Sequence, residues 1–184
     1  MNRPSILRRI SPGVAATLAA VLLLAAGCAS VPSNDVLIAD SRAAIVRFVD
    51  RDPTLKDWVD HAHGYAVFPS VGKGGLGVGG ALGRGIVFER GRPVGRARLY
   101  QGTVGAQIGV QNYAQVIFFQ DDAALKTFQR GNFEFSAQAT AVAAHAGAAA
   151  TTSYEKGVAV FIMTKSGLMV EASVGGQKFE YEPI

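Results

Sequence analysis

The stretch Gly64–Gly85 reads GYAVFPSVGKGGLGVGGALGRG and decides the fold of this 184-residue chain. Its first part, residues 65–68, has the composition of a short strand, and residues 72–85 hold eight glycines in fourteen positions. Glycine inside a strand marks a bend or the close approach of another backbone. We therefore expect a strongly curved or barrel-like sheet, with this stretch at its centre.

The residues that follow alternate between apolar and polar, which predicts further antiparallel strands. In residues 135–143 the many alanines favour a helix by propensity, but the apolar positions recur with period two, so we predict a strand there. A Lys165–Gly167 turn predicts a final hairpin. With the short strand at 65–68, this makes about eight strands, the others expected near residues 72–88, 94–100, 104–111, 113–119, 135–143, 158–164 and 168–175.

Three helices complete the predicted domain. Ser33 or Asn34 caps a helix that runs to about Asp50, and Thr54 caps a short helix over residues 55–62. A third helix is inserted after the strand at 113–119, from residues 121–122 to about 130. The fold class is therefore α+β: a single domain over residues 34–184, with two N-terminal helices and one inserted helix.

The N-terminus has the pattern of a targeting segment. Arg3, Arg8 and Arg9 precede an apolar run from Val14 to Ala26. Thirteen residues span about 20 Å as a helix, which is short of the roughly 30 Å hydrocarbon core of a bilayer. We therefore read residues 1–27 as a signal peptide and not as a transmembrane anchor.

Cys28 is the only cysteine of the chain, and it follows the small residues Ala25, Ala26 and Gly27. This arrangement resembles a bacterial lipobox, in which the thiol is acylated and the chain is cut before the cysteine. Ala25 stands where such motifs usually have leucine. The resemblance makes Cys28 the lipid anchor and residues 28–33 a lipidated tether, and Ala29 favours the outer membrane of the cell envelope. The alternative is an ordinary secretory signal with an incidental cysteine.

The charge balance argues against nucleic acid as a partner. The chain has 18 basic and 14 acidic residues and a sequence pI of about 9.4. Because three arginines leave with the signal peptide, 15 basic residues face the same 14 acidic ones in the mature chain. A nucleic-acid-binding domain normally carries a clear basic excess.

Motifs for catalysis and cofactors are incomplete. Gly75–Gly80 fits G-x-G-x-x-G, but the residues after it continue as a strand, whereas a dinucleotide site needs a helix there. His61 and His63 supply two metal ligands without a third close in sequence. The chain has no G-x-S-x-G motif. We expect no enzyme, no cofactor and no metal.

A basic stretch offers the best candidate binding site. Residues 73–98 hold six cations and one acid, Glu89. Arginine and lysine in loops of a curved sheet suit phosphate groups of lipids, and at a strand edge they equally discourage aggregation. Both interpretations stay open. The candidate headgroup-binding residues are Lys73, Arg84, Arg92, Arg96 and Arg98.

Together, Gly64–Gly85, the segment Gln107–Gln111 and the alternating strand from Phe135 resemble the SYLF domain, called the actin-binding domain in yeast endocytic proteins. The resemblance covers roughly residues 55–176. It implies binding of phosphoinositides and, in some members, of actin filaments; bacterial members are commonly secreted or lipid-anchored. Lys73 and Arg84 are the basic residues inside the matched glycine motif.

These observations predict an outer-membrane lipoprotein whose SYLF-like domain binds anionic phospholipid headgroups without catalysis, with phosphoinositides as one candidate ligand. The alternative is a structural envelope lipoprotein that acts through protein–protein contacts and has no lipid ligand.

Overall fold

The structure is a computed structural model that describes residues 33–131, 142–143, 146–164 and 176–184. The expected signal peptide, Cys28 and the strand expected at 168–175 lie outside these residues, as does most of the strand expected at 135–143. Among the described helices, none is both long and apolar enough to cross a membrane.

The three predicted helices are confirmed almost to the residue, because their start signals are local. Helix α2 spans Asn34–Arg51, α3 spans Leu55–His61 and α4 spans Asp122–Gln129. The Ser33 hydroxyl accepts a hydrogen bond from the Val36 N–H at 3.4 Å, and the Asp121 carboxylate caps α4. Thr54 differs from its prediction: its hydroxyl donates to Asp52 and does not cap α3.

Two long strands replace the several short ones that we expected. Strand β1 (Gly64–Glu89) and strand β2 (Arg92–Phe119) form one antiparallel hairpin. The two strands pair from Gly64↔Phe119 at one end to Glu89↔Arg92 at the other. The pairing is shifted in register at three places, between Phe68 and Val71, between Leu76 and Val78, and between Val87 and Phe88. The prediction of about eight strands is therefore not confirmed; the described part contains five.

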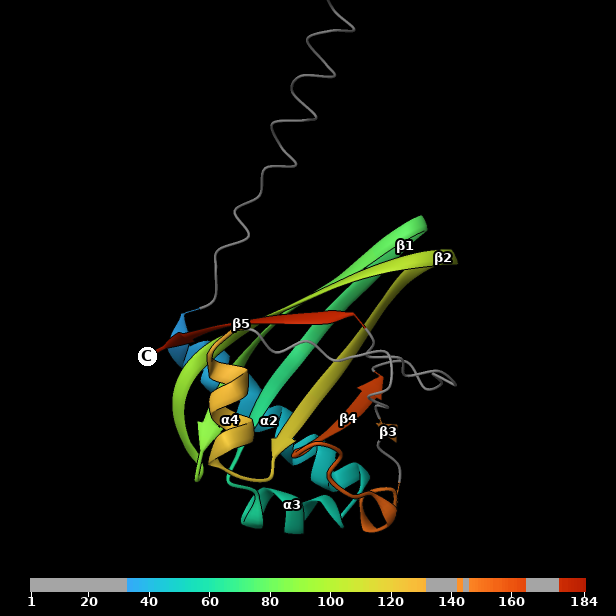
Figure 1. The fold of residues 1–184 in the computed structure, drawn as a ribbon. Coiled ribbons are helices and arrows are strands. Elements are labelled where there is room, and N and C mark those ends of the chain that lie inside the picture. Colours follow the sequence, from blue (N-terminus) through green and yellow to red (C-terminus); the bar gives the residue numbers. More distant parts are fainter. Residues whose placement is uncertain (1–32, 132–141, 144–145, 165–175) are drawn as a thin grey trace, which may run out of the picture. The chain divides into compact units, whose positions relative to one another are not determined.

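The remaining strands add to β2. Strand β4 (Val158–Thr164) pairs with the second half of β2, and β5 (Gln177–Pro183) pairs with the first half. Strand β3 (Val142–Ala143) runs parallel to β4, a departure from the all-antiparallel prediction. A short 3₁₀ helix, η1, spans Ala149–Thr151. Figure 1 shows β4 and β5 along different parts of the long hairpin.

The ribbon curves so far that the two ends of β1 meet. The Arg90 N–H donates to the His63 carbonyl at 3.3 Å, and a Cβ on Gly85 would collide with the Val67 carbonyl oxygen. The predicted strong curvature is therefore present (Figure 1), and the glycines do mark a close backbone approach. Within the described strands, however, no ladder closes the sheet, so the barrel-like shape is not confirmed.

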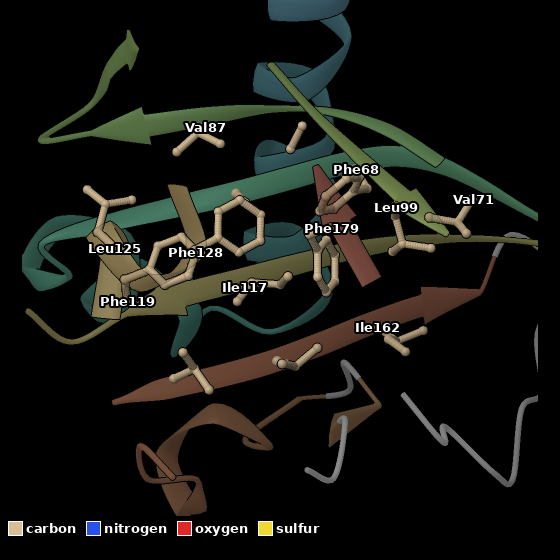
Figure 2. Packing of buried hydrophobic residues seen from close by; sticks show 14 of the residues in the cluster. Phe68, Val71, Val87, Leu99, Ile117, Phe119, Leu125, Phe128, Ile162 and Phe179 are labelled. Carbon is tan, nitrogen blue, oxygen red and sulfur yellow. The ribbon is translucent and has the colours of Figure 1, made fainter. Parts of the chain in front are cut away.

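The curved sheet buries apolar side chains on both faces. On the inner face Phe68 from β1 packs against Phe179 from β5, with 5.6 Å between the ring centroids, and Figure 2 shows Leu125 and Phe128 of α4 beside Phe119. On the outer face α2 covers part of the sheet through a second cluster that includes Leu37, Ala44, Phe48, Val67, Ile86 and Phe88. Trp58 of α3 and Ala149 of η1 belong to the same cluster, so they cover a further part of this face. The candidate site lies on the part of the outer face where Leu82, Arg84 and Arg98 are exposed.

Candidate functional site

Register places a set of side chains on the outer face of the sheet. Directly paired residues point to the same side, and so do residues two apart along a strand. Arg84 of β1 pairs with Arg98 of β2, which pairs with Glu180 of β5. One step along, Leu82, Tyr100 and Lys178 form a second such row. We call these six residues the basic face: Leu82, Arg84, Arg98, Tyr100, Lys178 and Glu180.

A hollow of about 670 Å³ adjoins the basic face at the bend of the ribbon. Its floor is mostly backbone because glycines supply half of the lining, and a Cβ added to Gly102 would meet nothing within 4 Å. We call it the glycine groove. It is lined by Gly72, Gly74, Gly80, Ala81, Leu82, Tyr100, Gln101, Gly102, Gly176 and Lys178.

The cations of the basic face take part in none of the ion pairs among the described residues, although Glu180 lies opposite Arg98 in register. Within that part of the chain, Arg84, Arg98 and Lys178 have no side-chain hydrogen bond or ion pair. Glu180, the register partner of Arg98, instead accepts a hydrogen bond from the Tyr100 hydroxyl at 3.1 Å. Two like charges directly across a strand pair destabilise the sheet. Arg84 and Arg98 therefore form a concentrated, exposed positive site.

The structure brings only part of the predicted basic set together. Arg96 lies on the same face, but its guanidinium contacts Glu182 at 2.6 Å and the Asn34 side chain at 3.2 Å, so it joins β5 and the start of α2. Arg92 is exposed beside the hairpin turn, where it pairs with Glu89. A register shift between Val87 and Phe88 turns Arg92 to the opposite face from Arg98.

Lys73 is separated from the arginines by the bend. It pairs with Gln111, and it stands between the groove residues Gly72 and Gly74. Strand alternation directs its side chain to the face opposite those glycines. Of the predicted set, the structure therefore brings Arg84 and Arg98 together and places Arg96 beside them. Arg92 and Lys73 lie apart from this group.

Sequence reasoning missed four residues of the basic face: Leu82, Tyr100, Lys178 and Glu180. Leu82 is 64% exposed, which is unusual for leucine in a strand. Its spacing of two from Arg84 could have indicated a shared face. Tyr100 and Lys178 join the site only through the β1–β2–β5 register, and no local signal reports that pairing.

The structure also shows the surroundings of the histidines and of the glycine motif that we considered as metal and nucleotide sites. His63 lies 3.3 Å from Glu89 and 3.9 Å from Asp122, whereas His61 contacts the backbone carbonyl of Asp57. Among the described residues, no group of three histidines, cysteines or carboxylates is arranged to hold a metal ion. Gly75–Gly80 continues as β1, so the helix that a dinucleotide site requires is replaced by a strand.

The family model Ysc84, described as "Las17-binding protein actin regulator", matches residues 100–182. This confirms the resemblance: that segment belongs to the Ysc84 (SYLF) domain family. The match includes Tyr100 and Lys178 and begins just after Arg98, and Arg84 lies outside it.

The chain is also similar to a named bacterial protein. It is 30% identical over 139 residues to beta cell expansion factor A of Aeromonas veronii. The similarity covers 74% of this chain and 52% of that protein, so the chain spans about half the length of this curated relative. A stretch of that size cannot avoid the middle of the chain, so it includes the glycine-rich part of β1.

Proposed function

We propose that this protein is a non-catalytic lipid-binding lipoprotein whose basic face contacts anionic phospholipid headgroups. The observation that carries the proposal is the exposed Arg84–Arg98 register pair, which has no ion-pair partner among the described residues. A guanidinium offers a planar fork of donors that matches phosphate oxygens. Each cation near an anionic membrane contributes about 1 kcal/mol, and a bound phosphate relieves the repulsion between the two arginines.

The apolar members of the basic face support contact with a membrane surface. Leu82 is 64% exposed, and it neighbours the Tyr100 ring in register. An exposed leucine gains about 2 kcal/mol when it leaves water for an apolar medium. Tyrosine favours the boundary between headgroups and hydrocarbon. Leucine, tyrosine and cations on one face are the combination that a phospholipid interface attracts.

The anchor that we propose at Cys28 would keep this face close to the bilayer. Asn34, the first residue of α2, lies 3.2 Å from Arg96 at the border of the basic face. Asn34 lies six positions after Cys28, and an extended chain of that length reaches at most about 21 Å. An acylated Cys28 would therefore hold the cations within reach of headgroups. The outer membrane of the bacterial envelope is the location that we propose.

Vesicle flotation tests headgroup binding. The mature chain carrying Cys28→Ser, without acyl groups, is mixed with vesicles of phosphatidylcholine alone or with added phosphatidylglycerol, cardiolipin or a phosphoinositide. We expect flotation only with the anionic vesicles, and we expect it to weaken as salt increases, because screening reduces the attraction. An absence of flotation with every anionic vesicle at low salt would remove the proposal.

Charge reversal assigns the binding to the basic face. Arg84→Glu with Arg98→Glu should reduce vesicle affinity by at least about tenfold, since a change of 1.4 kcal/mol already has that effect. Arg47→Glu with Arg130→Glu is the matched control, because both arginines are exposed and lie near the C-terminal ends of α2 and α4. If both double variants lose the same amount of vesicle affinity, the basic face is not the membrane-binding site.

A second candidate function is protein binding, since the family description names a protein ligand, Las17, for its members. In that case the basic face would contact an acidic protein of the envelope. The flotation experiment separates the two candidates: a protein-binding domain stays with the soluble fraction.

Radioactive palmitate labelling tests the anchor. Label should enter the full-length protein in bacterial cells and be lost in Cys28→Ala. Persistent labelling of that variant would exclude Cys28 as the acylated residue.

A further inference from the structure

We infer that the glycine groove seats one acyl chain of the bound anionic lipid, so that the domain holds a single lipid molecule and not only a membrane surface. This inference rests on the proposed headgroup binding. It adds a site for the acyl chain, which the basic face does not contact.

The shape of the groove suits a hydrocarbon chain. Its volume of about 670 Å³ falls within the range of roughly 300–1,000 Å³ typical of small-molecule sites. Glycines come from three strand segments: Gly72 and Gly74 from one half of β1, Gly80 from the other half, and Gly102 from β2. Without side chains on these positions, a chain of methylenes can lie directly on the sheet.

The groove walls supply the apolar contacts and the charge that an anionic lipid needs. Leu82 forms one wall, and Lys178 stands at another. Lys178 is exposed, and no ion pair holds its ammonium within the described part of the chain. Arg98 follows one row along the same face. A phosphate at Lys178 and Arg98 thus places the attached acyl chain at the mouth of the groove.

The occupant that fits both features is one anionic lipid molecule with an acyl chain in the groove, and a monomeric single-chain amphiphile is its simplest probe. A bare phosphate would use the cations and leave the groove empty, and a neutral hydrocarbon would leave the cations unpaired. A bilayer surface alone would engage the cations without removing a lipid. The experiment must therefore compare a headgroup, a monomeric amphiphile and a vesicle.

The probe is myristoyl lysophosphatidylglycerol, kept below its critical micelle concentration, in equilibrium dialysis against the mature chain carrying Cys28→Ser. We expect saturable binding of one molecule per chain. Glycerol 3-phosphate, which has the phosphate without the acyl chain, should bind at least about tenfold more weakly, because the apolar contacts are missing. Equal affinities for the two compounds would overturn the inference.

Gly102→Leu tests the groove itself. A Cβ at Gly102 meets no atom within 4 Å, so leucine fills the hollow without displacing described residues. We expect it to weaken amphiphile binding by at least about tenfold while vesicle flotation persists. Gln111→Leu adds the same side chain at an exposed position of the same strand, outside the groove lining, and should change neither.

The outcomes separate this inference from the proposed function. If the protein floats with anionic vesicles but does not bind the monomeric amphiphile, the role inferred for the groove is excluded and the proposed headgroup contact stands. Monomer binding that survives in a folded Gly102→Leu protein, with native circular dichroism, likewise overturns the groove. If the protein with an unmutated basic face floats with none of the anionic vesicles, the proposed function is excluded as well.

Discussion

Asp52 shows how one residue fastens two parts of the molecule. Its carboxylate is fully buried and accepts hydrogen bonds from the Thr54 hydroxyl at 2.6 Å and from the Gly147 and Ala149 N–H groups at 3.0 and 2.8 Å. It therefore links the end of α2 to the segment that carries η1. Burial by itself would raise the pKa of Asp52, but the hydrogen bonds from Thr54, Ala149 and Gly147 outweigh burial and lower it.

Replacing this carboxylate should cost stability. Asp52→Asn keeps the size but removes the charge. Because both carboxylate oxygens accept hydrogen bonds, the asparagine NH₂ group would face a donor at either position. We expect a loss of about 2–4 kcal/mol in the free energy of unfolding, measured by urea denaturation at neutral pH. Asp57→Asn, at an exposed position of α3, is the matched control and should cost less than about 0.5 kcal/mol.

The same residue predicts a pH dependence. Because the pKa of Asp52 is lower in the folded state, its stabilisation is present above the unfolded pKa of about 3.9 and is lost as pH falls through the lowered folded value. The stability gap between the wild type and Asp52→Asn should therefore shrink on acidification below about pH 4. A gap of constant size down to acid unfolding would contradict this assignment.

At the scale of elements, local signals predicted the helices, and long-range pairing determined the rest. Ser33 and Asp121 indicate the starts of α2 and α4 in the sequence, and their side chains form the expected N-caps. The glycines of β1 indicated curvature, yet they could not indicate that β1 and β2 remain continuous. Strand β5 completes the basic face, but its pairing joins residues about 80 positions apart along the chain, and no periodicity encodes that register.

Gly85 tests whether curvature depends on glycine at the closest approach of β1 to itself. A Cβ there would collide with the Val67 carbonyl and lie 2.8 Å from the Phe68 ring. Backbone cannot yield as a flexible side chain can, so Gly85→Ala should destabilise the domain by about 3 kcal/mol or more.

Gly102→Ala is the comparison, because a Cβ at Gly102 meets open space. It should unfold within about 0.5 kcal/mol of the wild type in the same urea titration. If the two alanine variants are equally stable, the two halves of β1 do not approach each other as closely as the structure has them.

At the scale of the whole molecule, the site exists because three distant segments meet on one face. The sequence predicted Arg84 and Arg98 through a local excess of cations, but it also included Arg92, which a bulge turns away, and Arg96, which an ion pair with Glu182 occupies. Charge counts along a chain do not report the face of a strand or the presence of a partner. Lys178 shows the converse, since a single lysine became part of the site through pairing alone.

The proposed anchor and the basic face would make distinguishable contributions to membrane contact. The acyl groups proposed at Cys28 would hold the protein on a vesicle whatever the face does, since each buried methylene contributes about 0.8 kcal/mol. The basic face would then decide orientation. Leu82→Cys, labelled with an environment-sensitive fluorophore in acylated protein whose Cys28 thiol is blocked by lipid, reports whether that face meets the membrane.

We expect a blue shift of the fluorophore on phosphatidylglycerol vesicles and a smaller one on phosphatidylcholine, because only the anionic surface attracts the cations. Adding Arg84→Glu and Arg98→Glu should abolish the difference while the acylated protein stays on the vesicles. The same label at Thr127, an exposed position of α4, serves as the control and should respond equally to both lipids. Equal shifts at residue 82 with and without the charge reversal would mean that the anchor alone sets the orientation, and that the arginine pair has another ligand.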